Sequence, residues 1–173
     1  TAGSTAASPP CAADFDGDGE TEIAWASQGS FHVFDLDGTE VWKTSVADFS
    51  GLSGCSGYDV DGDEVYEVLY ADEAQFYLFD GKTGAINYTN TSHSSATLFE
   101  YPTVADVDGD DSAEILYVSN YLMTGGTGHA LTVLGHDGDG WAKSGATWPI
   151  FDFAVTNINQ DGTLPSTVPL YWQ

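Results

Sequence analysis

Short apolar segments alternate with Asp- and Gly-rich turns along most of the chain. Three apolar segments each follow a Glu directly, at residues 23–25, 68–70 and 115–118. Each is followed by a second apolar segment, at residues 31–35, 76–80 and 131–135. Their length and their Gly and Asp boundaries predict β-strands. No window sustains the 3.6-residue period of a helix. The sequence therefore predicts an all-β protein.

Each pair of apolar segments is followed by a turn and then by an aromatic residue. The turns contain Gly and lie at residues 37–38, 80–84 and 137–140, and the aromatic residues are Trp42, Tyr88 and Trp141. Gly-containing turns between apolar segments are typical of hairpins. We therefore expect a last strand at each aromatic residue.

An acidic segment with the pattern Asp-x-Asp-Gly-Asp-x-x-x-Glu precedes each unit, at residues 14–22, 59–67 and 106–114, and a weaker copy begins at Asn157. The four copies start at intervals of 45, 47 and 51 residues, a period typical of propeller blades. We predict a β-propeller-type repeat array of four-stranded antiparallel blades, about three and a half in number. The blades would lie near residues 11–55, 56–101 and 102–152, with a partial one at residues 153–173.

The acidic pattern supplies the ligand type that calcium prefers. Carboxylates at positions 1, 3 and 5 converge if the backbone curls, Gly at position 4 permits the turn, and position 7 can add a carbonyl before the Glu at position 9. The pattern favours calcium over magnesium, and it lacks the Cys and His ligands of zinc sites. One such segment could be an ordinary acidic turn, but three in register predict three calcium sites.

The predicted ligands are the following. The first loop offers Asp14, Asp16, Asp18 and Glu22 with the Glu20 carbonyl; the second offers Asp59, Asp61, Asp63 and Glu67 with the Val65 carbonyl; the third offers Asp106, Asp108, Asp110 and Glu114 with the Ser112 carbonyl. The weaker copy keeps Asn157, Asn159 and Asp161 but has Pro165 at position 9, so a fourth ion is an additional candidate.

Charge changes the picture in two ways. The chain has 27 acidic residues against three Lys and no Arg, for a net charge of -24. Such a chain would repel the phosphates of nucleic acid. A hydrophobic content of 42% argues against the disorder that this charge would otherwise suggest. We also find no stretch near the 18 apolar residues of a membrane span.

Two cysteines, Cys11 and Cys55, lie at nearly equivalent positions in adjacent repeats. They could form a disulfide or remain two buried free thiols, since the sequence does not prove connectivity. Few Lys, acidic loops and paired Cys together favour an extracellular setting.

Residues 1–10 are small and polar, which predicts a linker or stalk that could carry O-linked sugar. Residues 87–89 and 90–92 match the N-glycosylation pattern.

With these loops at this period, and with the approach at residues 102–106, the chain resembles the FG-GAP/VCBS repeat family over roughly residues 11–161. The resemblance implies calcium-binding β-propeller blades of the kind also found in integrin α-subunit heads, bacterial surface proteins and some lectins. Propellers have four to eight blades. The predicted three and a half would therefore need further blades of a longer chain, or another copy, to complete them.

Three function classes remain. The first is a non-enzymatic extracellular structural or adhesive module, stabilised by calcium, with self-assembly into an oligomer or filament as its extension. The second is a carbohydrate-binding module that stacks sugars on Tyr121, Trp148 or Trp172; its partner would be a glycan or a cell-surface protein. Catalysis is the least favoured, because His32, His93, His129 and His136 are scattered and the clustered carboxylates are assigned to calcium. An insertion at residues 120–128 could carry specificity or could be a tolerated surface insertion.

Overall fold

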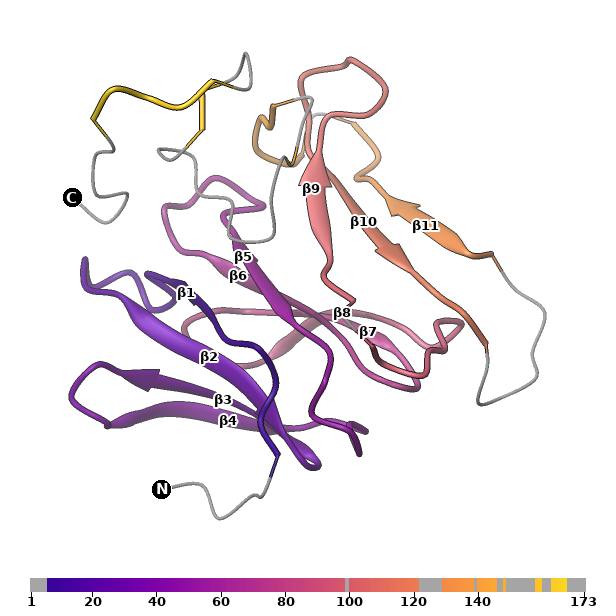
Figure 1. Ribbon diagram of the computed structural model, residues 1–173. Coiled ribbons are helices and arrows are strands. Elements are labelled where there is room, and N and C mark those ends of the chain that lie inside the picture. The colour runs from indigo at the N-terminus through magenta and orange to yellow at the C-terminus, as the bar shows by residue number, and fades with distance from the viewer. Residues whose placement is uncertain are drawn as a thin grey trace.

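The computed structural model describes residues 6–98, 100–121, 129–138, 140–145, 148, 158–159 and 163–167. These residues form eleven strands in three antiparallel sheets (Figure 1). The first sheet contains β1 (Cys11–Ala13), β2 (Glu22–Ser27), β3 (Ser30–Asp35) and β4 (Glu40–Ser45); the second contains β5 (Cys55–Tyr58), β6 (Glu67–Ala71), β7 (Phe76–Phe79) and β8 (Ile86–Asn90); the third contains β9 (Thr103–Ala105), β10 (Glu114–Val118) and β11 (Leu131–Leu134). The prediction of an all-β protein is confirmed.

Each sheet is a simple up-and-down arrangement in which neighbours in sequence are neighbours in the sheet. The predicted strands after each Glu are β2, β6 and β10, and the second aligned group forms β3, β7 and β11. Trp42 and Tyr88 lie in the fourth strands β4 and β8, as expected. Trp141 does not begin a strand, so the prediction is wrong there: this ring instead packs against the apolar core. The described residues contain no helix that could span a membrane.

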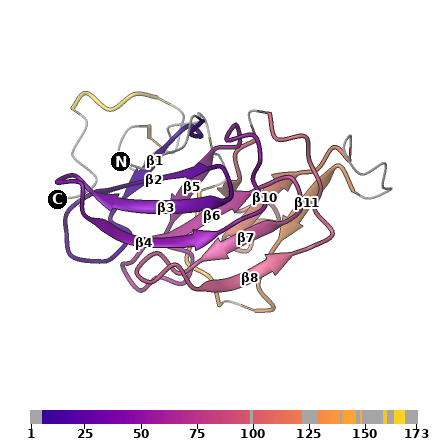
Figure 2. The ribbon, with the colours of Figure 1, turned by 90° about the horizontal axis from the view of Figure 1, so that it is seen from below.

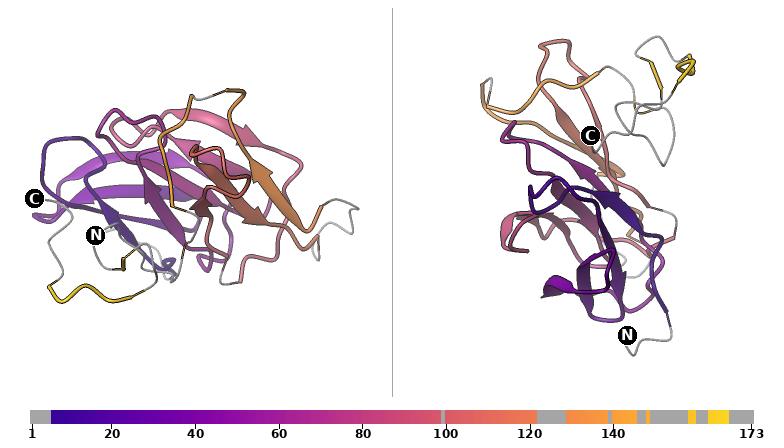
Figure 3. Two further views of the ribbon diagram at one scale, coloured as in Figure 1. Left: turned by 90° about the horizontal axis from the view of Figure 1, so that it is seen from above. Right: turned by 90° about the vertical axis from the view of Figure 1, so that its left-hand side faces the viewer.

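The sheets follow one another in chain order, with the second between the other two (Figures 2 and 3). One apolar cluster fills the space between the first and second sheets, and it includes Phe31, Tyr70 and Phe79. Another fills the space between the second and third sheets and includes Phe76 and Tyr117. Burial of these large side chains is the main favourable term that holds sheet to sheet.

A disulfide joins the first strands of the first two sheets. Cys11 in β1 and Cys55 in β5 are bonded, with their Cα atoms 5.5 Å apart and a sequence separation of 44 residues. This result decides between the two alternatives that the sequence left open. The bond adds a covalent link between two sheets that are also joined by apolar packing, by hydrogen bonds and by the connector at residues 46–54.

The connectors between sheets are held by buried carboxylates at the opposite end from the acidic loops. Asp72, fully buried after β6, accepts a hydrogen bond from the Ala47 backbone N–H at 2.7 Å. It also accepts bonds from the Tyr77 hydroxyl and from two N–H groups of its own turn. Asp48, also fully buried, accepts a bond from the Tyr70 hydroxyl at 2.7 Å. Each buried charge is thus satisfied by several donors, as its burial requires.

Glu73 connects both connectors to the second sheet. Its carboxylate accepts the Phe49 N–H at 3.1 Å and the Thr97 hydroxyl at 3.2 Å. Glu100 lies nearby and accepts hydrogen bonds from the Ser95 hydroxyl and the Asn120 amide. Burial raises the pKa of Glu100. The connectors are therefore ordered by carboxylates of their own and of the turn after β6, and not by regular secondary structure of their own.

Loss of the disulfide should lower stability without changing the fold. For a loop of this length, replacing both cysteines (Cys11→Ala with Cys55→Ala) should cost about 2–4 kcal/mol of unfolding free energy. Urea unfolding measures this, and the control is the double variant in reducing agent, which should show no further change. An unchanged unfolding midpoint for the reduced native protein would contradict the prediction.

Removal of the Asp72 carboxylate should also destabilise the fold. Asp72→Ala leaves four donors without their acceptor, which should cost about 2–4 kcal/mol. Asp137→Ala is the control, because Asp137 is exposed and its loss should change stability by less than about 0.5 kcal/mol. Equal thermal unfolding midpoints for the two variants would show that the buried network contributes little.

Candidate metal sites

The three acidic loops occupy equivalent places in the three sheets. Residues 14–21 join β1 to β2, residues 59–66 join β5 to β6, and residues 106–113 join β9 to β10. All three loops therefore lie at the same end of the stack (Figure 1). The first two are in contact, since the Tyr66 N–H donates to the Asp14 carbonyl at 3.3 Å. The regular spacing in sequence thus becomes a row of loops in space.

The Asp at position 1 organises each loop. One carboxylate oxygen accepts the N–H of the Gly at position 4, at 2.8 Å from Asp14, 2.7 Å from Asp59 and 2.7 Å from Asp106. Its other oxygen accepts the N–H of the residue at position 6 in all three loops. These bonds curl the backbone around the carboxylate, as the sequence pattern predicted.

Position 6 has a backbone requirement that the pattern did not reveal. Its φ angle is positive in all three loops: 89° at Gly19, 71° at Glu64 and 71° at Asp111. Only the first loop uses glycine, which adopts this conformation at little cost. In the other two loops the hydrogen bond to the Asp at position 1 helps to hold a residue that rarely adopts this conformation. The glycine at position 19 was the one available signal.

The Glu at position 9 is buried at the start of the second strand in each sheet. Glu22, Glu67 and Glu114 are 1%, 6% and 7% exposed. Each accepts the N–H of the residue at position 2, at 2.6 Å, 2.8 Å and 2.9 Å respectively. The carboxylate of this Glu therefore links the end of the loop to its start and lies close to the Asp side chains.

Burial has a clear electrostatic consequence for two of these groups. Desolvation, with neighbouring carboxylates adding to it, raises the pKa of Glu22 and of Glu67 to about 7 in the absence of a cation. The pKa values of Asp16 and Asp61 are raised for the same two reasons. A negative charge at these positions is thus costly unless a cation compensates it.

Each loop brings several carboxylate oxygens together. In the first loop Asp14, Asp16, Asp18 and Glu22 each offer an oxygen, and all lie within 4.8 Å of one another. The second loop does so with Asp59, Asp61 and Glu67, and the third with Asp106, Asp108 and Glu114. The Asp side chains at position 5 of these two loops, Asp63 and Asp110, lie outside the groups and accept the N–H at position 7. The carbonyl ligands at Glu20, Val65 and Ser112 remain predictions.

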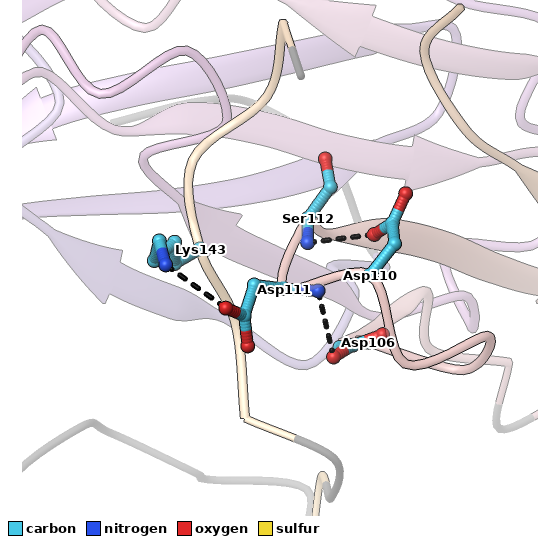
Figure 4. A network of polar contacts seen from close by, with 5 residues as sticks. All are labelled: Asp106, Asp110, Asp111, Ser112 and Lys143. Carbon is cyan, nitrogen blue, oxygen red and sulfur yellow. Dashed lines mark hydrogen bonds and ion pairs between the residues drawn. The ribbon is translucent and has the colours of Figure 1, made fainter. Parts of the chain in front are cut away.

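The donor set fits a hard cation. Every converging atom is a carboxylate oxygen, and ligands on opposite sides of a calcium ion lie about 5 Å apart. Three acidic clusters could therefore hold a metal ion. They are not interchangeable, because the third has a basic neighbour: the Lys143 ammonium lies 3.0 Å from the Asp111 carboxylate at position 6 (Figure 4).

Residues 140–145 also connect the second and third loops through the backbone. The Ala142 N–H donates to the Val60 carbonyl at 2.7 Å, and the Asp106 N–H donates to the Gly145 carbonyl at 3.1 Å. The Tyr58 hydroxyl donates to the Lys143 carbonyl at 3.0 Å. The sequence did not suggest this role for the segment after β11, because a bridging backbone has no side-chain signature.

The fourth copy lies largely outside the described residues, including Asn157 and Asp161. Asn159 is described, and its backbone N–H and side-chain amide both donate to Thr163, at 2.8 Å and 2.9 Å. These contacts form a local turn and leave the prediction of a fourth ion untested.

His32, His93, Tyr121 and Trp148 have structural contacts. His32 and His93 are buried in different parts of the fold, where they bond Ser27 and Ser119 at 2.9 Å and 2.8 Å. Burial lowers the pKa of both. Trp148 contacts the ring of Tyr58 and packs against the second apolar cluster. The Tyr121 hydroxyl donates to the Ser92 carbonyl at 3.0 Å, and Trp172 lies outside the described residues.

Comparison with known proteins places these loops in context. A search of curated protein sequences found no match. A crystal structure of the V. cholerae biofilm matrix protein Bap1 is similar, with a TM-score of 0.73 and 29% identity over 88% of this chain. The chain spans 26% of the length of that protein. The family model for the FG-GAP-like repeat matches residues 14–70, a segment that includes the first two acidic loops. The chain therefore carries an FG-GAP-like repeat, as the resemblance in its sequence predicted.

Proposed function

We propose that this chain is a calcium-stabilised β-propeller-type module with a structural or adhesive role outside the cell. The observation that carries the proposal is the threefold recurrence of one acidic loop at the same place in three successive sheets. Each copy combines converging carboxylates with a buried Glu. An exposed acidic turn needs no cation. A buried Glu beside other carboxylates favours one, because burial and like charges both disfavour its negative charge.

Calcium suits this geometry better than its competitors. Its coordination shell of six to eight oxygens tolerates the irregular set of side chains and carbonyls that one loop can offer, whereas magnesium prefers a regular octahedron with retained water. Extracellular calcium modules of moderate affinity work at the concentrations found outside cells. The disulfide between Cys11 and Cys55 agrees with an oxidising location.

The ions would act on stability, since the loops lie where the sheets begin. The Glu at position 9 is the first residue of β2, β6 and β10. An ion held by this Glu and by the Asp at position 1 would join the ends of the first two strands in each sheet. Ions would also reduce repulsion in a chain of charge -24.

The structural or adhesive role rests on likeness to the biofilm matrix protein. The propeller arrangement is supported by three antiparallel sheets that follow one another in chain order, and further blades would have to complete it. Carbohydrate binding stays an alternative without added support, because Tyr121 and Trp148 have contacts within the fold. A non-enzymatic module is also part of the proposal.

Calcium should bind the second loop through Glu67 and raise the stability of the fold. Glu67→Gln should lower calcium affinity at that site by about tenfold or more, because it removes a negative ligand. The matched control in the same loop is Glu64→Gln, since Glu64 lies at position 6, outside the group of converging oxygens. Isothermal titration gives the affinities, and the thermal unfolding midpoint with and without chelator gives the stabilisation.

The proposal fails if chelator leaves the unfolding midpoint of the native protein unchanged. It also fails for the second loop if Glu64→Gln and Glu67→Gln reduce calcium binding equally.

The stability of the calcium-free protein should fall as pH rises. The pKa values of Glu22 and Glu67, about 7 in the fold, lie above their ordinary value of 4.5. Between these values the folded chain binds more protons than the unfolded chain, so the free energy of unfolding decreases through this window. With calcium the carboxylates stay ionised, so stabilisation by calcium should grow over the same range.

Thermal unfolding in chelator from pH 5 to pH 8 measures the effect. The control is the double variant Glu22→Gln with Glu67→Gln. In this variant the unfolding midpoint should change less with pH, because the two groups of raised pKa are gone. Some change should persist, because other acidic groups remain. Equal slopes for the native chain and the double variant would contradict the assignment to these two groups.

A further inference from the structure

The interface between successive sheets is built from equivalent positions. In the first two sheets, the residues two and four positions after the buried Glu pair with two residues of the next strand, and the four side chains lie on one face. We call this the forward face; it consists of Ala24, Ala26, Phe31 and Val33 in the first sheet, and of Leu69, Ala71, Phe76 and Leu78 in the second. All eight residues are buried.

Each forward face packs against the sheet that follows. The ring of Phe31 lies 4.9 Å from that of Tyr70 and 5.6 Å from that of Phe79. The ring of Phe76 lies 4.2 Å from that of Tyr117, nearly parallel to it. The side chains that a forward face contacts belong to the next sheet. They alternate along their strands with that sheet's own forward-face residues, because successive side chains of a strand point to opposite sides. We call this second set the backward face.

The third sheet has the same forward face but no sheet follows it among the described residues. Leu116 pairs with Val133, and Val118 pairs with Leu131, in the register of the other two sheets. Here Val118, Leu131 and Val133 are 46%, 52% and 47% exposed. All four side chains are aliphatic, so a surface equivalent to two buried interfaces is open to water. Apolar surface of this kind commonly marks an interaction site.

The first sheet shows the complementary surface. Its backward positions are Ile23, Trp25, His32 and Phe34, which correspond to Val68, Tyr70, Tyr77 and Phe79 in the second sheet. The Trp25 and Phe34 rings stack with centroids 4.9 Å apart, and Trp25 also stacks on His32 at 5.8 Å. Ile23, Trp25 and Phe34 are partly exposed and His32 is buried, and no sheet precedes this face among the described residues.

We propose that the forward face of the third sheet binds the backward face of the first sheet of a second copy of this chain. A second copy is the partner that matches the two interfaces inside the chain. In both of these interfaces an aromatic ring, Tyr70 or Tyr117, contacts the forward face, and a second copy offers Trp25 at the equivalent position. The two surfaces are different, so the contact is heterologous and can continue into a ring or an open filament. This proposal deepens the structural role proposed above and rests on it.

Charge sets the conditions for this contact. Copies of charge -24 repel one another, and salt screens that repulsion over about 10 Å at 0.1 M. Bound calcium would lower the charge of each copy. Association should therefore be stronger in excess calcium and at moderate ionic strength than in chelator at low salt.

The test uses sedimentation velocity of the full chain over a range of concentrations in excess calcium. Native protein should show a weight-average mass that rises with concentration. Val133→Lys blocks the forward face of the third sheet, and Phe34→Lys blocks the backward face of the first; each alone should abolish the rise. Lysine lowers the net negative charge, so this loss cannot come from added repulsion. Ile86→Lys is the control, since Ile86 in β8 is 47% exposed and lies on neither face.

A mixture of the two blocked variants gives the decisive result. Val133→Lys keeps an intact backward face and Phe34→Lys keeps an intact forward face, so together they should form a one-to-one dimer that does not grow. Each variant must first match the native far-ultraviolet circular dichroism; Leu131→Lys and Ile23→Lys replace any variant that fails.

Three results would overturn the proposal. These are a native protein that stays monomeric at every concentration, blocked variants that associate like the native chain, and a mixture that forms no dimer. A monomer would mean that another part of the chain or a different protein covers the face. Calcium titration of the same samples separates this failure from failure of the proposed function, because a monomer that binds calcium and is stabilised by it overturns the contact alone.

Discussion

Burial of one Glu per repeat beside several Asp side chains is the constraint on which the rest of the structure depends. Glu22, Glu67 and Glu114 each begin the second strand of a sheet and each accept a backbone N–H from the loop above. This arrangement fixes where the loop ends and where the strand enters the apolar interior. It also concentrates negative charge where water cannot fully solvate it. A fold that repeats such a feature three times carries an electrostatic cost that the proposed cations would offset, and its stability would then depend on their supply.

Apolar packing between sheets supplies the second organising force. The two clusters share one geometry, in which a forward face meets the alternating residues of the next sheet. The disulfide and the bonds that Trp42 and Thr44 donate to the turn after β7 reinforce the first of these interfaces. The second has no disulfide and instead has the bridging segment at residues 140–145. Exposed Val118, Leu131 and Val133 lie at the positions that this contact covers in the first two sheets.

Much of the site could be predicted because the loop is local. The hydrogen bonds that the side chains of Asp14, Asp59 and Asp106 accept all come from residues within five positions along the chain. The converging groups contain most of the predicted side chains, and Asp63 and Asp110 lie outside them. Position 6 was missed because two of its three residues, Glu64 and Asp111, carry no sign of a positive φ. The last strand expected at Trp141 was wrong because burial of that ring against the second cluster prevailed over the hairpin pattern.

The sequence by itself determined the features that depend on near neighbours: strands, hairpins, acidic loops and their period. Tertiary structure decided what depends on contacts between distant segments. It paired Cys11 with Cys55, buried Asp48 within the first connector and Asp72 beside it, and placed the Ala142 backbone against Val60. It also determined that the forward faces of the first two sheets are buried and that the forward face of the third sheet is exposed. The physical reason is that hydrogen bonds within a loop depend on local residue types, whereas burial depends on which surfaces the whole chain brings together.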